Sequence, residues 1–202
     1  MGKFWIVQGL FAWLIFPLMG TLWAFPDGYS FSTLFSSGNN TAYLSIFYGM
    51  LWGIGNLTFG LSMRYLGVAL GQSIALGTCS AFGTIIPAMM SGKNIFSGEG
   101  LVLLISVSVA IAGIAVIGFA GSLRSQNLTD ELKKAAIKDF AFGKGIFVAI
   151  MAGFMSACFS LGIEAGLVIK NKLIGLGVNV FFAGLPVIFL ITLGGFITNA
   201  LY

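Results

Sequence analysis

Charged side chains are scarce in this 202-residue chain, and histidine is absent. Only 8% of the residues are Asp, Glu, Lys or Arg, whereas soluble globular domains carry about 25%. A surface this poor in charge does not stay dispersed in water, so the composition excludes a soluble globular protein. Without histidine the chain lacks the commonest metal ligand and the usual proton shuttle at neutral pH.

Cysteine is also rare, and the motifs of the common enzyme classes are missing. Cys79 and Cys158 lie inside apolar segments without paired spacing, and we predict that they are small core residues. The sequence has no Walker motif, no paired carboxylates and no Ser/His set, so we expect no enzymatic activity, no cofactor and no metal. The net charge of +4 does not indicate nucleic-acid binding, because the basic residues lie between apolar segments.

Long apolar runs dominate what is present. Hydrophobic residues make up 58% of the chain and its mean hydropathy is +1.01. A helix needs about 20 apolar residues to cross a bilayer. Runs of about that length predict six spans, at residues 4–25, 42–63, 68–91, 100–121, 145–165 and 180–201. The fold class is therefore an all-α polytopic membrane protein, with residues 1–202 as a single membrane domain.

Lysine and arginine predict how the chain is oriented. Seven lie on the N-terminal side of the predicted spans and three on the other: Lys3, Arg64, Arg124, Lys133, Lys134, Lys138 and Lys144 against Lys93, Lys170 and Lys172. The positive-inside rule then places both ends in the cytoplasm.

The main polar segment, residues 122–143, becomes a cytoplasmic loop. Within it, a cap at Thr129 and apolar residues at four-residue spacing predict a short amphipathic helix on the membrane surface. Its role is either that of a linker or that of a regulatory docking site.

Three polar residues are unexpected inside apolar spans: Asn56, Gln72 and Glu164. Such residues face a bundle interior or a water-filled path, because lipid does not solvate them. Glu164 is the one carboxylate within a predicted span, and it is our candidate for proton coupling. The alternative is that Glu164 lies among the lipid headgroups, paired with Lys170 or Lys172.

Asn56 follows Trp52 by one helical turn, so the two share a helix face. An indole ring beside an amide suits a sugar, which has apolar C–H faces and a rim of hydroxyls. The alternative for Asn56 is a hydrogen bond between helices. A polar stripe on the third span consists of Gln72, Ser73, Thr78, Ser80 and Thr84, of which Gln72, Ser80 and Thr84 approximate one face. We predict that Trp52, Asn56 and these last three residues bind substrate.

Glycine and proline indicate thin and kinked helices. Glycines spaced four residues apart allow close helix packing, and they occur at Gly49/Gly53, Gly67/Gly71 and Gly162/Gly166. Prolines inside predicted spans should kink the helices or free carbonyl groups, and they occur at Pro17, Pro87 and Pro186.

Residues 49–71, GMLWGIGNLTFGLSMRYLGVALG, resemble the L-rhamnose–proton symporter family of the drug/metabolite transporter superfamily. Weaker similarity extends over most of the chain, in the stretches 5–15, 74–87, 113–121, 154–157 and 184–186. The resemblance implies a proton-coupled symporter that imports L-rhamnose or a related deoxy sugar across a bacterial inner membrane. It also implies a ten-helix fold of two inverted halves, with substrate at their interface near the midplane.

The chain resembles only helices two to seven of that family. We therefore expect a fragment, from a truncated gene model, a split gene or a decayed copy, which does not transport by itself. A second chain supplying the other helices is then a partner, besides the sugar, the proton and the lipid bilayer. The alternative function is a non-transporting membrane scaffold or partner subunit.

Overall fold

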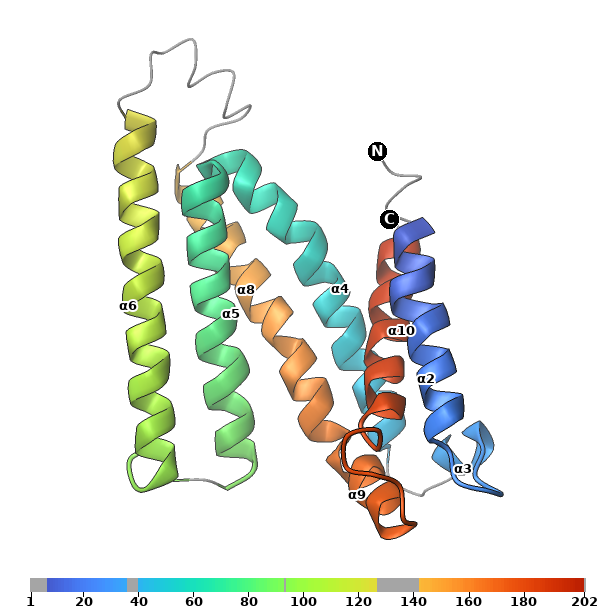
Figure 1. The fold of residues 1–202 in the computed structure, drawn as a ribbon. Coiled ribbons are helices and arrows are strands. Elements are labelled where there is room, and N and C mark those ends of the chain that lie inside the picture. The colour runs from blue at the N-terminus through green and yellow to red at the C-terminus, as the bar shows by residue number, and fades with distance from the viewer. Residues whose placement is uncertain (1–6, 36–39, 93, 127–141, 202) are drawn as a thin grey trace. The chain divides into compact units, whose positions relative to one another are not determined.

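The computed structural model describes residues 7–35, 40–92, 94–126 and 142–201. All regular structure in these ranges is helical (Figure 1). The elements are the π-helix η1 (Leu10–Ile15) and the α-helices α2 (Phe16–Ala24), α3 (Phe31–Phe35), α4 (Thr41–Leu66), α5 (Val68–Met90), α6 (Glu99–Gln126), α8 (Phe142–Ala165), α9 (Leu167–Gly175) and α10 (Leu185–Leu201).

Within the described residues, five helical segments are long and apolar enough to cross a membrane. They are Val7–Ala24, Thr41–Leu66, Val68–Met90, Glu99–Ala120 and Gly143–Gly175. The sixth predicted span is also an apolar helix, but α10 has 17 residues and begins at Leu185 rather than at 180. Turns occupy the residues before it, where Phe182 and Ala183 donate backbone hydrogen bonds to the carbonyl of Asn179. The prediction of an all-α polytopic membrane protein is confirmed.

The three prolines within predicted spans behave differently. Pro17 follows the π-helix η1, in which the Phe16 N–H reaches back to the carbonyl of Phe11; a π turn is one way to absorb the missing proline donor. Pro87 lies inside α5. The prediction for Pro186 was wrong, because this residue is second in α10, where a proline fits the first turn without losing a hydrogen bond.

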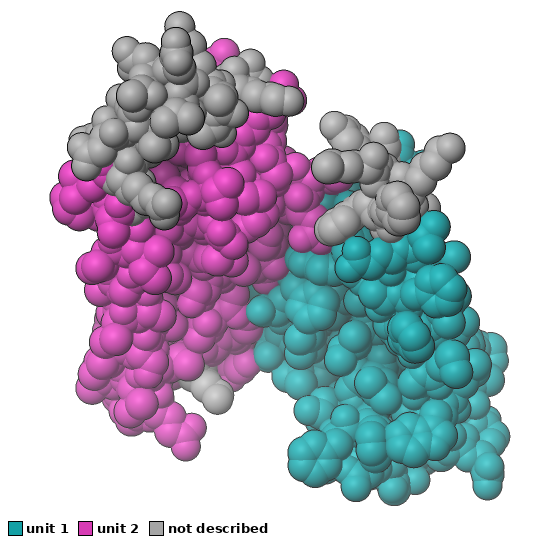
Figure 2. Space-filling model, turned by 45° about the horizontal axis from the view of Figure 1, so that its top comes forward, with its two compact units in different colours: residues 1–53, 158–202 teal, residues 54–157 magenta. Residues whose placement is uncertain are grey.

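The chain forms two compact units (Figure 2). Unit 1 comprises residues 1–53 and 158–202, and unit 2 comprises residues 54–157. Helices α4 and α8 each contribute one end to each unit.

Unit 1 is built around α10. Its core contains large aliphatic side chains, and Leu173, Leu190 and Ile191 are completely buried. Helix α9 adds Ile169, and the short helix α3 adds Leu34. The segment between the first two predicted spans includes α3.

Unit 2 begins with a helical hairpin. Gly67 alone separates α4 from α5, with φ of +82°, a conformation that glycine adopts without steric cost. A Cβ at Gly71 would lie only 2.8 Å from the Ser62 carbonyl oxygen, so the two helices meet backbone to backbone. This confirms the close helix packing predicted at Gly67/Gly71. The core of unit 2 is small, with Ala75, Ala149 and Ala152 as its centre.

The predicted cytoplasmic loop, residues 122–143, overlaps the last residues of α6 and the first of α8. Its centre, residues 127–141, lies outside the described residues, and so does the amphipathic helix predicted there.

Candidate functional site

Helices α4 and α10 cross in unit 1 with glycine on both sides of the contact. A Cβ at Gly49 would collide with the carbonyl of Ile191, and one at Gly194 with the carbonyl of Ile46. A Cβ at Gly53 would lie 2.8 Å from the Thr198 side chain. The predicted Gly49/Gly53 packing face is therefore present, and its partner is the Gly194–Gly195 pair of α10.

This close approach brings α10 side chains within hydrogen-bond reach of the α4 backbone. Thr198 Oγ1 donates to the carbonyl of Met50 (3.1 Å), and Asn199 Nδ2 donates to the carbonyls of Gly53 (3.4 Å) and Gly195 (2.8 Å). Ser45 Oγ, fully buried, donates to the carbonyl of Gly162 on α8 (3.2 Å). Bonds of this kind hold helices together in lipid, where apolar burial gives no driving force.

Trp52 lies at this crossing and forms the centre of an aromatic cluster. The rings of Trp13 and Phe159 meet it edge-on, at centroid distances of 5.3 and 5.2 Å. Gly195 faces its six-membered ring, since a Cβ there would lie 2.5 Å from two ring atoms. The indole is thus fixed in orientation by three elements, and it remains half-buried.

Asn56 follows Trp52 by one turn of the continuous helix α4 and is half-buried. The predicted shared helix face is therefore present in the backbone. Trp52 belongs to unit 1, whereas Asn56 belongs to unit 2 with Gln72, Ser80 and Thr84.

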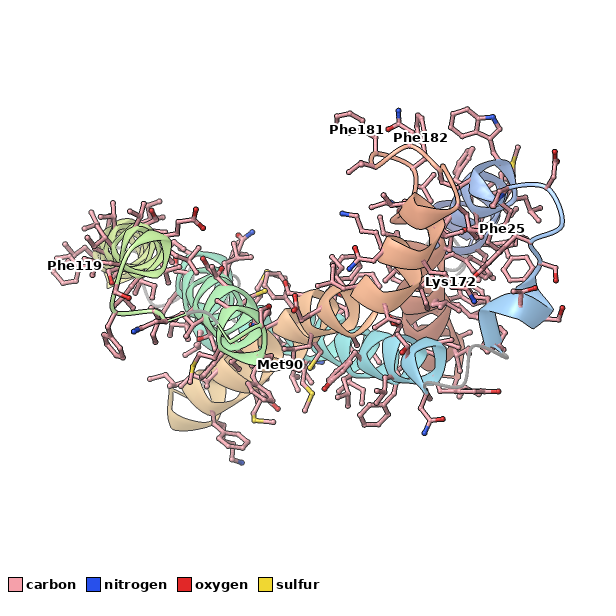
Figure 3. All side chains as sticks on the ribbon, turned by 90° about the horizontal axis from the view of Figure 1, so that it is seen from below. Phe25, Met90, Phe119, Lys172, Phe181 and Phe182 are labelled. Atoms are coloured by element: carbon pink, nitrogen blue, oxygen red, sulfur yellow. The ribbon has the colours of Figure 1, made fainter. Side chains whose placement is uncertain are left out.

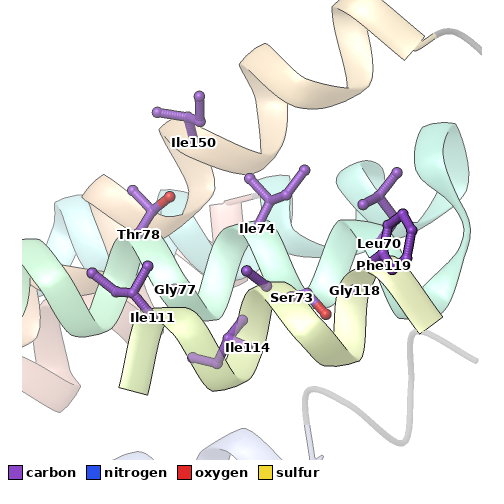
Figure 4. Close-up of a pocket in the computed structure, with 11 residues that line it drawn as sticks. Leu70, Ser73, Ile74, Gly77, Thr78, Ile111, Ile114, Gly118, Phe119 and Ile150 are labelled. Atoms are coloured by element: carbon purple, nitrogen blue, oxygen red, sulfur yellow. The ribbon is translucent and has the colours of Figure 1, made fainter. Parts of the chain in front are cut away.

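Two residues of the polar stripe on α5 line the cavity of unit 2, and the other three do not. A cavity of about 540 Å³ is lined chiefly by α5 and α6 (Figure 4), and its α5 wall includes Ser73 and Thr78. Gln72, Ser80 and Thr84 do not line it. Gln72 is exposed, and the other two are half-buried. Their role as substrate-binding residues stays a prediction.

Glu164 is the penultimate residue of α8, half-buried in unit 1. A carboxylate near the C-terminus of a helix faces the negative end of the helix dipole. Helix α9 follows directly and carries Lys170 and Lys172. The ammonium of Lys172 lies 5.8 Å from the centre of the Tyr29 ring.

Sequence reasoning missed Thr198 and Asn199, which lie on α10 opposite the conspicuous glycines of α4. Their spacing from Gly194 and Gly195, one turn each, was the available signal.

In the part of the chain that the structure describes, no three residues of the metal-ligating types His, Cys, Asp and Glu gather at one place. Cys158 is buried, which confirms the prediction of a small core residue, whereas Cys79 is only half-buried.

A sequence profile described as L-rhamnose-proton symport protein (RhaT) matches residues 1–202. The chain belongs to this family. It is 34% identical over 199 residues to an L-rhamnose-proton symporter of Pectobacterium atrosepticum and 33% identical over 199 residues to one of Mannheimia succiniciproducens. A Yersinia pestis protein of the same name is 32% identical over 208 residues. The family is one of sugar–proton symporters and not of enzymes.

These alignments cover 96–98% of this chain but only 56–57% of each relative. The chain thus spans little more than half the length of the curated relatives it matches. No solved structure matches it.

Proposed function

We propose that this chain acts in the proton-coupled import of L-rhamnose, or of a related deoxy sugar, across a bacterial inner membrane. The observation that carries the proposal is the family match, which extends over every residue of the chain. The long apolar helices of both units are the scaffold that such a transporter needs.

The sugar-binding residues in this proposal are Trp52, Asn56, Gln72, Ser80 and Thr84. Trp52 is the best supported of them, because a held indole offers a sugar a preformed apolar surface at little cost in conformational entropy. On α10, Asn199 lies beside Gly53. Its Oδ1 has no partner among the described residues, so it can accept a hydrogen bond from a sugar hydroxyl. No charged group is needed for a neutral sugar.

Glu164 is the proposed coupling residue, and both chain ends are proposed to lie in the cytoplasm. Glu164 lies at the end of α8, and the lysines of α9 follow it in the chain. In this proposal its carboxyl group binds a proton on one side of the membrane and releases it on the other. Sugar and proton binding are then linked, so each favours the other.

The test is equilibrium binding of radiolabelled L-rhamnose to the purified chain in lipid nanodiscs. We expect saturable binding that unlabelled L-rhamnose displaces and D-glucose does not. Affinity should rise as the pH is lowered, because a coupled proton favours sugar binding, and Glu164→Gln should flatten this dependence. Lys170→Gln is the matched control, since it removes a nearby charge but no exchangeable carboxyl proton.

Saturable binding whose pH dependence survives Glu164→Gln would remove Glu164 from the mechanism and leave the sugar assignment intact. No saturable binding in any buffer would contradict the proposed function and favour a membrane scaffold.

A further inference from the structure

Unit 1 contains a cavity that none of the residues proposed above lines. It lies where α2 ends and where the loop between α9 and α10 passes, and its volume is about 360 Å³. Small-molecule sites in proteins commonly enclose about 300–1,000 Å³. Its lining comes from residues 23–26 on one side and from residues 176–179 with Phe182 on the other.

Local backbone structure fixes the conformation of both walls. Helix α2 ends at Ala24, and Phe25 is extended because Pro26 follows it. On the other wall, Gly177 has φ of +88° and donates its N–H to the carbonyl of Ile174, while Val178 donates to the carbonyl of Leu173. This pair of bonds is a Schellman cap. The backbone on both sides of the cavity is therefore held by its own local structure.

The first wall presents an aromatic surface. Trp23 is 68% exposed, and Phe182 meets its ring edge-on with the centroids 4.4 Å apart and the planes at 72°. An edge-on neighbour steadies an indole while leaving ring surface open. Phe25 lines the same wall, and its ring contacts Tyr29 and Phe31.

The second wall presents hydrogen-bond donors. Asn179 Oδ1 accepts the N–H of Phe181 at 3.0 Å, which is an Asx turn and sets which side-chain atom is oxygen. Within the described residues no acceptor is found for the Asn179 Nδ2 group, and the side chain is exposed. Two N–H donors therefore stand at the cavity beside the aromatic wall.

These features suit a neutral ligand that has one apolar face and a polar edge. None of the residues that line the cavity is charged, so nothing there compensates an ionic ligand. Under the proposed orientation this end of unit 1 faces away from the cytoplasm, the side from which an imported sugar arrives. From this, and resting on the proposed function, we infer that the cavity is a second, outer site for a deoxy monosaccharide, whose C–H face stacks on Trp23 and whose hydroxyls accept from Asn179.

Exposed aromatic residues at the end of a span also anchor proteins in the membrane interface, and the test must separate the two roles. Phe181 provides the control, because it is 88% exposed and lies on the same loop as Phe182 (Figure 3) but does not line the cavity. Interface anchoring would make Phe181 and Trp23 equivalent, whereas the sugar site requires only Trp23.

The experiment counts the L-rhamnose molecules bound per purified chain in nanodiscs. We expect two for the unaltered chain, and the loss of one in Trp23→Leu. Leu176→Trp, which fills the cavity and leaves Trp23 in place, should also lose one. Phe181→Leu should retain both.

Three other results would overturn the inference. One bound sugar that Trp23→Leu and Leu176→Trp leave unchanged would mean that the outer site does not exist while the proposed function stands. An equal loss in Phe181→Leu and Trp23→Leu would mean membrane anchoring. No bound sugar at all would remove the proposed function together with this site.

Discussion

Unit 1 closes around leucine, isoleucine and valine side chains, whereas the buried centre of unit 2 is mostly alanine. Helix α10 of unit 1 buries eight of its residues, among them Leu190 and Ile191. Helix α6 of unit 2 instead leaves large apolar side chains exposed along its length, such as Val109 (67%) and Phe119 (66%).

The difference shows what determines helix packing in an apolar solvent. Burying valine against another helix gains little when the alternative is lipid, so α6 can remain exposed. The close contacts of unit 1 depend on glycine and on hydrogen bonds to the backbone, at Gly49 and Thr198 for example. Four substitutions test this comparison.

Gly49→Ala should have the largest effect on stability. The new methyl group would meet the carbonyl of Ile191, whose carbon lies 2.8 Å away, and a backbone group in a helix cannot turn aside. We expect a loss of about 3 kcal/mol in the free energy of unfolding, the upper part of the range for overpacking. SDS titration in mixed micelles measures it. Gly60→Ala, in the same helix with open space around the new Cβ, should cost nothing.

Leu190→Ala should come second. Leu190 is completely buried, and its truncation leaves a cavity that costs about 2 kcal/mol, the low end for leucine because lipid and not water is the surrounding solvent. The same titration applies. Leu101→Ala, at a position of α6 that is 42% exposed, should change stability by less than about 0.5 kcal/mol. Equal losses at both positions would contradict the contrast between the units.

Trp52→Leu tests whether the aromatic cluster around Trp52 binds sugar. We expect the affinity of the proposed site at Trp52 for L-rhamnose to fall at least about tenfold, or 1.4 kcal/mol, because leucine replaces the indole by a smaller apolar group. Radioligand binding measures the change. Phe119→Leu, on the exposed face of α6, should leave affinity unaltered. An unchanged affinity in Trp52→Leu would assign Trp52 to packing alone.

Thr198→Val should have the smallest effect. It removes the hydrogen bond from α10 to the carbonyl of Met50 on α4, and such bonds between membrane helices contribute about 0.6 kcal/mol. Thr58→Val is matched to it, since Thr58 Oγ1 bonds only to carbonyls of its own helix, those of Ile54 and Gly55. Comparing the two variants by SDS titration separates an interhelical bond from an intrahelical one.

Much of the fold could be predicted from the sequence, because apolar length decides a membrane span. The tight Gly67 turn and the Gly49/Gly53 face were also readable, since only glycine allows a positive φ or touching backbones. The start of α10 could not be predicted, because residues 180–184 are as apolar as α10 itself. Only the backbone turn at Asn179 distinguishes them from the helix. Helices α3 and α9 were missed because they are too short for a periodic pattern.

The candidate site was less predictable. Helical spacing placed Trp52 and Asn56 on one face correctly, but it could not name the groups that other elements bring to Trp52. Trp13, Phe159 and Gly195 are distant in sequence. For the same reason the cavity at Trp23 and Asn179 was not foreseen, since its walls come from residues at least 150 positions apart.

Saturation-transfer NMR of L-rhamnose with the chain in nanodiscs detects whether the aromatic surfaces of unit 1 bind a deoxy sugar. We predict strong transfer from the protein to the methyl and ring C–H protons of the sugar, reduced in both Trp52→Leu and Trp23→Leu and abolished when the two are combined. The absence of transfer, or transfer that the combined variant retains in full, would mean that these surfaces do not bind the sugar.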